Sequence, residues 1–196
     1  MAVDDCRANL IAAATPLFAE KGFNGVGVRE LANAAGVNPA MISYYFGGKE
    51  GLYAAVLTEQ FEPLKRVSAL KVMDDDPMKK FEMYVRATVA RYRKSPHLLS
   101  FYTSELTNPT PCCDTIVKPA IRGVVQTLIE TFTEGLSHDQ FRKGLNPADT
   151  VLALAGMINF YFLLEPVTGE FVDHSPERDE EVIQHIMDVF SKGVLK

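Results

Sequence analysis

Hydroxyl side chains are concentrated around residue 44. Ser43, Tyr44 and Tyr45 follow one another, and the small or apolar Ala40 and Met41 lie just before them. Hydroxyl groups bond well to phosphate oxygens, and small apolar side chains can approach the methyl group of thymine. Two adjacent tyrosines beside a serine are hard to place in a core when the helix that carries them is short. These residue types therefore favour contact with double-stranded DNA.

Two short helices would have to present these side chains. Residues 28–35 predict a helix that Gly36 ends, and Asn38 and Pro39 then supply the N-cap and first position of a second helix, which ends near Gly47. In a helix-turn-helix, the first helix braces against the DNA backbone and the second enters the major groove. Ordinary packing of two short helices is the alternative. The side chains expected to face the core are Leu31, Val37, Ile42 and Phe46.

The charge of this region sets the kind of contact to expect. The chain carries a net charge of −5, and residues 1–62 hold seven acidic and four basic side chains, namely Arg7, Lys21, Arg29 and Lys49. The segment therefore lacks the basic patch that is usual in nucleic-acid binders. Lys49 begins a helix, where backbone N–H groups and an ammonium together favour an anion. We expect a shallow salt dependence, from about two or three ionic phosphate contacts per subunit.

Helical periodicity continues along the rest of the chain, and no segment reads as a strand. The expected fold is all-α. A kink is expected at Pro63, helix starts at Asp76-Pro77, Ser95-Pro96, Asn146-Pro147 and Ser175-Pro176, and a loop over 108–114. The expected helices are 5–21, 28–35, 38–47, 49–70, 77–94, 95–107, 115–136, 147–165 and 176–194.

Several function classes are disfavoured. The most apolar stretch, 151–164, is shorter than the roughly 20 residues of a membrane span, and Asp4 and Asp5 argue against a signal peptide. Three cysteines do not make a disulfide framework, so a reduced, cytoplasmic chain is expected. The four histidines lack ligand spacing, and no catalytic motif is found, so neither a metal, a cofactor nor an enzyme is expected. The adjacent Cys112 and Cys113 leave thiol sensing open as a minor alternative to an incidental pair.

A series of motifs in residues 5–57 resembles the DNA-binding domain of the TetR-type transcriptional regulators. The motifs are Leu10-Ile11-Ala12-Ala13-Ala14, Phe18-Ala19-Glu20-Lys21-Gly22-Phe23, Val28-Arg29-Glu30-Leu31-Ala32, Ala35-Gly36-Val37-Asn38 and Tyr44-Tyr45-Phe46-Gly47-Gly48-Lys49-Glu50-Gly51-Leu52. The resemblance implies a three-helix DNA-binding domain over 1–48. A larger helical effector-binding and dimerisation domain would follow over 49–196.

The resemblance also assigns roles at matched positions. It implies phosphate contacts for Asn38, Ser43, Tyr44, Tyr45 and Lys49, and places Pro39, Ala40 and Met41 at base edges. Val28 stands where the family often has a hydroxyl, so only its backbone N–H would serve. Arg29 and Arg7 are candidates to compensate for that missing contact.

For the C-terminal part, the resemblance implies a homodimer formed by the last two long helices, with recognition helices roughly 34–36 Å apart on a palindromic operator. A small hydrophobic effector would release a repressor from that operator, although an activator is not distinguished. A helical interaction protein that has lost specific DNA binding is the alternative. The residues expected to line the effector pocket are Phe81, Tyr84, Val85, Thr88, Phe101, Tyr102, Glu105, Met157, Asn159, Phe160 and Tyr161. A partner for Asn159 is expected either across the dimer or on the ligand.

Overall fold

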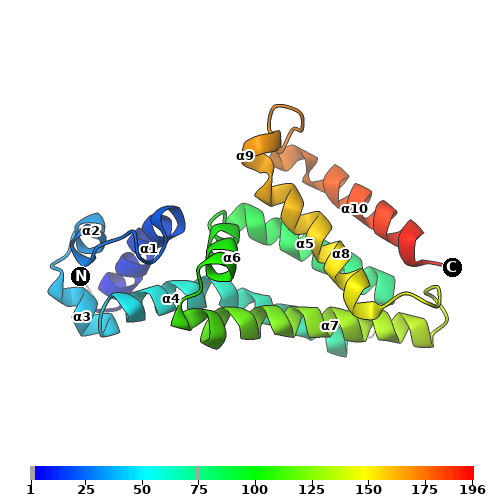
Figure 1. Ribbon diagram of the computed structural model, residues 1–196, viewed down its shortest axis with the longest axis horizontal. Helices are drawn as coiled ribbons and strands as arrows, with labels where there is room; N and C mark the ends of the chain where they lie inside the picture. Colours follow the sequence, from blue (N-terminus) through cyan, green and yellow to red (C-terminus); the bar gives the residue numbers. More distant parts are fainter. Residues whose placement is uncertain (1–2, 74–75) are drawn as a thin grey trace. The chain divides into compact units, whose positions relative to one another are not determined.

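The computed structural model describes residues 3–73 and 76–196, and helices make up its regular structure (Figure 1). Within these ranges no strand is present, and the only β-type pairing is an isolated bridge between Phe141 and Leu195. The expected all-α fold is confirmed. The elements are α1 (Val3–Lys21), α2 (Val28–Ala34), α3 (Ala40–Phe46), α4 (Lys49–Phe61), the 3-10 helix η1 (Glu62–Val72), α5 (Pro77–Lys94), α6 (Leu98–Thr107), the π-helical η2 (Cys113–Val117), α7 (Lys118–Ser137), α8 (Pro147–Leu163), α9 (Glu165–Thr168), η3 (Pro176–Arg178) and α10 (Asp179–Val194).

Side-chain caps fix the start of two long helices. The Asp76 carboxylate accepts from the amides two and three residues later, at 2.9 and 3.3 Å, and Pro77 occupies the first turn of α5. Asn146 does the same for α8, at 2.9 and 3.2 Å, with Pro147 following it. These caps satisfy orphan N–H groups of the first turn. Both starts agree with the sequence-based expectation; Asp74 and Asp75 lie outside the described residues.

Other boundaries were predicted wrongly. The helix expected over 49–70 ends at Phe61 and continues as the 3-10 helix η1, because Pro63 has no N–H to donate and its ring crowds the preceding turn. The expected cap at Ser95 is absent, and α6 begins at Leu98. Likewise, no side chain caps the start of η3 after Ser175. The loop expected over 108–114 is shorter, since helical structure resumes at residue 111 and passes into η2.

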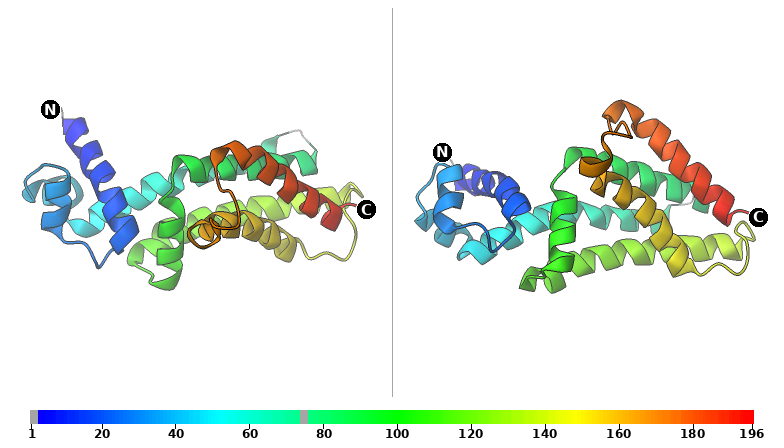
Figure 2. Two further views of the ribbon diagram at one scale, coloured as in Figure 1. Left: turned by 90° about the horizontal axis from the view of Figure 1, so that it is seen from above. Right: turned by 45° about the horizontal axis from the view of Figure 1, so that its top comes forward.

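Packing divides the chain into two compact units. The N-terminal unit comprises the residues up to Pro63 together with Pro96–Ala120, and the C-terminal unit comprises Leu64–Ser95 and Ile121–Lys196. α1 packs on α2 and α4 in the first unit, and α10 packs on α5 and α8 in the second (Figure 2). The functional boundary expected after residue 48 stays a prediction, since it concerns activity and not packing.

Aromatic side chains fill the core of the C-terminal unit. The ring of Phe81 lies 5.1 Å from that of Phe190 on α10, and Phe132 stacks on Phe141 at 4.8 Å. Gly135 makes room for this stack, because a Cβ there would lie 2.2 Å from the Phe141 ring. Across residues 3–73 and 76–196, no helix combines the length and the apolar character that crossing a bilayer requires.

Candidate nucleic-acid interface

The turn between α2 and α3 is held by backbone hydrogen bonds. Gly36 has φ of +65°, a conformation that glycine adopts without steric cost. Val37 N donates to the carbonyl oxygen of Ala32 at 3.0 Å, which closes the end of α2. Asn38 Oδ1 accepts from Ala40 N at 2.9 Å, but α3 begins at Ala40 with Pro39 in the N-cap position, so this helix starts two residues later than expected. The turn is therefore determined by local sequence on both sides.

Buried apolar side chains hold α2 and α3 against the core of the N-terminal unit. Leu31 of α2 and Ile42 of α3 are fully buried, as expected, whereas Val37 and Phe46 are only half-buried. The end of α3 lies unusually close to α4, since a Cβ at Gly51 would come within 1.8 Å of the Phe46 carbonyl oxygen. Glycine at this position is what allows α3 and α4 to meet so tightly.

The outer face of α2 and α3 presents the predicted contact residues. Tyr44 is 75% exposed, and its ring meets that of Tyr45 edge-on at 5.0 Å. A tyrosine as exposed as Tyr44 contributes little to a monomer core. The remaining predicted DNA contacts are exposed at Val28, Arg29, Asn38, Ala40 and Ser43, and half-buried at Pro39, Met41, Tyr45 and Lys49.

Three basic side chains of this region contact an aromatic ring or an acidic side chain. Lys49 Nζ lies 4.4 Å from the ring centroid of Phe23, and the Arg7 guanidinium lies 5.3 Å from that of Phe46. Lys21 pairs with Glu30 at 2.5 Å, which raises the pKa of the lysine and lowers that of the carboxyl. Phe23 was recognised only as part of a motif, because its ring contacts join residues far apart in sequence.

A buried hydrogen bond joins α4 to α6 in the same unit. The Tyr53 hydroxyl donates to Glu105 Oε1 at 2.7 Å, and burial together with this carboxylate raises the pKa of Tyr53 well above its usual range. Glu105 was predicted to line an effector pocket, yet it is fully buried and already bonded to Tyr53 and Thr110. Sequence reasoning missed this pair, since 52 residues separate its members.

The other predicted effector residues are distributed over both units. Phe101 and Tyr102 lie on α6 of the N-terminal unit, and the rest lie on α5 and α8 of the C-terminal unit. Asn159 Oδ1 accepts from the Tyr92 hydroxyl at 2.6 Å, so its amide oxygen has a partner within the C-terminal unit; a partner for the rest of the amide on a ligand or across the dimer stays a prediction. Buried positions are Phe81, Tyr84, Val85 and Phe101; Thr88, Tyr102, Met157, Asn159 and Tyr161 are half-buried, and Phe160 is exposed.

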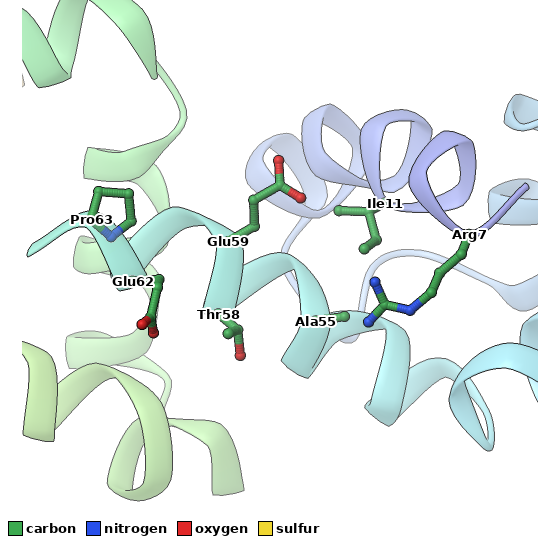
Figure 3. Close-up of a pocket in the computed structure, with 7 residues that line it drawn as sticks. All are labelled: Arg7, Ile11, Ala55, Thr58, Glu59, Glu62 and Pro63. Carbon is green, nitrogen blue, oxygen red and sulfur yellow. The ribbon is translucent and has the colours of Figure 1, made fainter. Parts of the chain in front are cut away.

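A groove of about 410 Å³ lies between α1 and α4 (Figure 3). The lining residues are Arg7, Ile11, Ala55, Thr58, Glu59, Glu62 and Pro63. None of the predicted effector residues contributes to it, so the groove does not correspond to the predicted pocket.

The cysteines occupy a structured segment. Cys113 is buried and its thiol donates to the Glu105 carbonyl oxygen at 3.3 Å, while Cys112 is half-buried. Burial raises the pKa of both thiols, which disfavours the reactive thiolate form. All three cysteines are free, and the described residues hold no group of three or more potential metal ligands.

Comparison with known proteins places the strongest similarity on the segment that carries this interface. Residues 10–56 match the family described as bacterial regulatory proteins, tetR family. The probable HTH-type transcriptional regulator YttP of Bacillus subtilis is 51% identical over 53 residues, which cover 27% of this chain and 26% of YttP. The HTH-type transcriptional repressor DhaR of a Mycobacterium species is 24% identical over the whole chain, covering 95% of DhaR.

Similarity of fold extends over the entire chain. The solved structure of the ketosteroid transcriptional regulator KstR2 of Mycobacterium tuberculosis superposes with a TM-score of 0.80 at 17% identity, covering 97% of this chain and 95% of KstR2. The first curated relatives are matched over only about a quarter to a half of their own length. The motif match and the exposed second helix make residues 10–56 similar to the tetR family of bacterial regulatory proteins, and the similarity in helical fold extends over nearly all of the chain.

Proposed function

We propose that the protein is a DNA-binding transcriptional regulator, most simply a repressor, that acts in the cytoplasm as a homodimer. The observation that carries the proposal is the outward face of α3, where Tyr44 is 75% exposed beside an exposed Ser43. On a capped, glycine-bounded helix, these hydroxyls are available to phosphate oxygens and contribute nothing to the core. The protein is proposed to act by binding and not by catalysis.

The proposed contacts fall into two groups. Asn38, Ser43, Tyr44, Tyr45 and Lys49 would contact phosphates, with Arg7, Arg29 and the Val28 backbone N–H as further contacts, and Pro39, Ala40 and Met41 would face base edges. Since Lys21 is paired with Glu30, few cations remain for DNA. The salt dependence of binding should accordingly be shallow.

Dimerisation is proposed through the outer face of α8 with α10. Val151, Leu154 and Ile158 of α8 face the core, yet Leu152 is 54% exposed and Phe160 is 60% exposed on the same helix. Val189 of α10 is exposed as well. A helix that is apolar on both sides gains stability when a partner covers its outer side. A second copy of the chain is the partner that a palindromic operator requires.

A small hydrophobic effector is proposed to lower the affinity for DNA. The candidate contacts are Phe81, Tyr84, Thr88, Phe101, Tyr102, Glu105, Asn159 and Tyr161. The effector would need to favour the DNA-free form by only a few kcal/mol.

The test of DNA binding uses fluorescence anisotropy with duplexes selected by the protein from genomic fragments, beginning with DNA upstream of its own gene. The double substitution Ser43→Ala with Tyr44→Phe should weaken specific binding by about tenfold or more, through loss of hydroxyl–phosphate bonds. The same chemical changes on α6, Ser100→Ala with Tyr102→Phe, serve as the control and should leave binding unchanged. Absence of binding to any fragment at low salt would instead support a helical interaction protein.

A further inference from the structure

The carboxyl group of Glu105 is buried and accepts hydrogen bonds from uncharged donors. The Glu105 side chain is fully buried. It accepts from the Tyr53 hydroxyl at 2.7 Å, from Thr110 Oγ1 at 2.9 Å and from Thr110 N at 3.2 Å. A buried polar group is tolerated only when such bonds are kept. The positions of Tyr53 and Thr110 are therefore tied to Glu105 and to each other.

Tyr53 links Glu105 of α6 to aromatic residues of the DNA-binding segment. Its side chain is 1% exposed, so its ring has little freedom to move. The ring meets Phe18 of α1 edge-on at 4.9 Å and lies 5.0 Å from Phe23. Because its hydroxyl is fixed by Glu105, the Tyr53 ring sets where Phe23 can lie.

The ring of Phe23 in turn contacts the ammonium group of Lys49. Lys49 Nζ lies 4.4 Å from the Phe23 ring centroid, at the first residue of α4. Cation–π contact of this kind limits the directions in which a flexible lysine side chain can point. An unbroken series of contacts within the N-terminal unit thus runs from Thr110 through Glu105, Tyr53 and Phe23 to Lys49.

We propose that Glu105 is a positioning residue for Lys49, acting through Tyr53 and Phe23. A rearrangement of the segment 108–112 that withdraws Thr110 from Glu105 loosens Tyr53, and Lys49 then loses its fixed place. The inference rests on the proposed function only where Lys49 is taken to contact DNA. Coupling through a contiguous network must be demonstrated by perturbing its separate members.

The first measurement needs no DNA. The full chain is labelled with ¹³C-lysine, the Lys49 resonance is assigned with Lys49→Arg, and its ring-current shift reports its place over Phe23. Phe23→Leu should abolish the upfield shift, and Tyr53→Phe and Glu105→Leu should reduce it. Glu105→Gln keeps one oxygen for both hydroxyls and should retain most of the shift. Val56→Ala, a buried truncation in α4 away from the series, is the control and should leave it unchanged.

Four results would overturn the proposal. The first is a Lys49 resonance that keeps its wild-type upfield shift in Phe23→Leu, and the second is one that keeps it in both Tyr53→Phe and Glu105→Leu. The third is a change in Val56→Ala as large as that in Tyr53→Phe and Glu105→Leu. The fourth is a change in Glu105→Gln as large as that in Glu105→Leu. If Glu105→Leu does not fold, Tyr53→Phe and Glu105→Gln decide the question.

The second measurement separates positioning from DNA contact. The salt dependence of binding to a mixed-sequence 30-bp duplex is compared for the wild type, Lys49→Gln and Tyr53→Phe. Lys49→Gln should lower the slope by about one per subunit, and Tyr53→Phe should lower it by part of that amount. An unchanged slope in Lys49→Gln, with the expected lysine shifts, would refute the DNA contact of Lys49 and leave its positioning by Glu105 supported.

Discussion

The guanidinium of Arg7 on α1 lies 5.3 Å from the ring centroid of Phe46, the last residue of α3. The contact ties the proposed recognition helix to a helix that does not belong to the helix-turn-helix. Figure 3 shows the same side chain extending from α1 towards Ala55 of α4. Arg7 thus helps to fix the C-terminal end of α3 from outside the motif.

Replacing Arg7 with glutamine should loosen this end of α3. Because the cation–π contact is exposed, we expect a loss of about 0.5–1 kcal/mol in the free energy of unfolding. Urea denaturation measures the loss, and a cycle with Phe46→Leu isolates the pair. Arg29→Gln removes the same charge from an exposed site and should change stability far less. Equal losses in the two variants would contradict a specific role for the Phe46 contact.

Gly51→Ala should disrupt the junction of α3 and α4. The added Cβ would lie 1.8 Å from the Phe46 carbonyl oxygen, so the backbone must move. We expect a destabilisation of about 3 kcal/mol or more. Gly123→Ala in α7 is the control, because its Cβ meets open space; it should gain about 0.5–1 kcal/mol from helix propensity. Chemical denaturation compares both, and a neutral Gly51→Ala would mean that the two helices separate easily.

Local sequence predicted the starts of α5 and α8, whereas the pairing of residues far apart in the chain could not be predicted from it. Asp76 and Asn146 cap helices through amides two or three residues away, and Asn38 accepts from the amide two residues after it, so each pattern contains its own partner. The contacts of Glu105 with Tyr53 and of Lys49 with Phe23 join separate elements and leave no periodic signal. Glu105 was for that reason interpreted as a pocket residue, whereas the structure gives it partners of its own.

Alkaline pH should weaken the α4–α6 junction through Tyr53. The pKa of Tyr53 is raised from its ordinary value of 10.0, chiefly by burial and then by its hydrogen bond to Glu105. A raised folded-state pKa means that this stability is complete below pH 10 and is lost as the pH rises above it. Urea midpoints measured upwards from about pH 9 should fall more steeply for the wild type than for Tyr53→Phe. Parallel curves would show that Tyr53 titrates alike in both states.

Acid should weaken the attachment of α10 to α5. Arg86 binds the Glu180 carboxylate at 2.5 and 2.8 Å, and its hydrogen bonds lower the pKa of Glu180 to about 2. A lowered folded-state pKa means that the stability is present above the ordinary value of 4.5 and is lost as the pH falls towards 2. In Glu180→Gln, the urea midpoint should change less with pH over this window than it does in the wild type. Glu170→Gln, at an exposed position outside this pair, should leave the wild-type slope intact.

A charge placed on the outer face of α8 should separate the proposed dimer. Leu152 and Phe160 are 54% and 60% exposed on α8, so Leu152→Glu and Phe160→Glu should leave the monomer core in place. Burying either carboxylate against a second copy would cost several kcal/mol, which shifts the dimer dissociation constant by about a hundredfold or more. Sedimentation velocity over a concentration series measures the shift, and circular dichroism checks the helical content. Val72→Glu is the matched control, since Val72 is 87% exposed on η1, outside α8 and α10. If Val72→Glu dissociates the dimer and the two α8 variants do not, the dimer forms through a different surface.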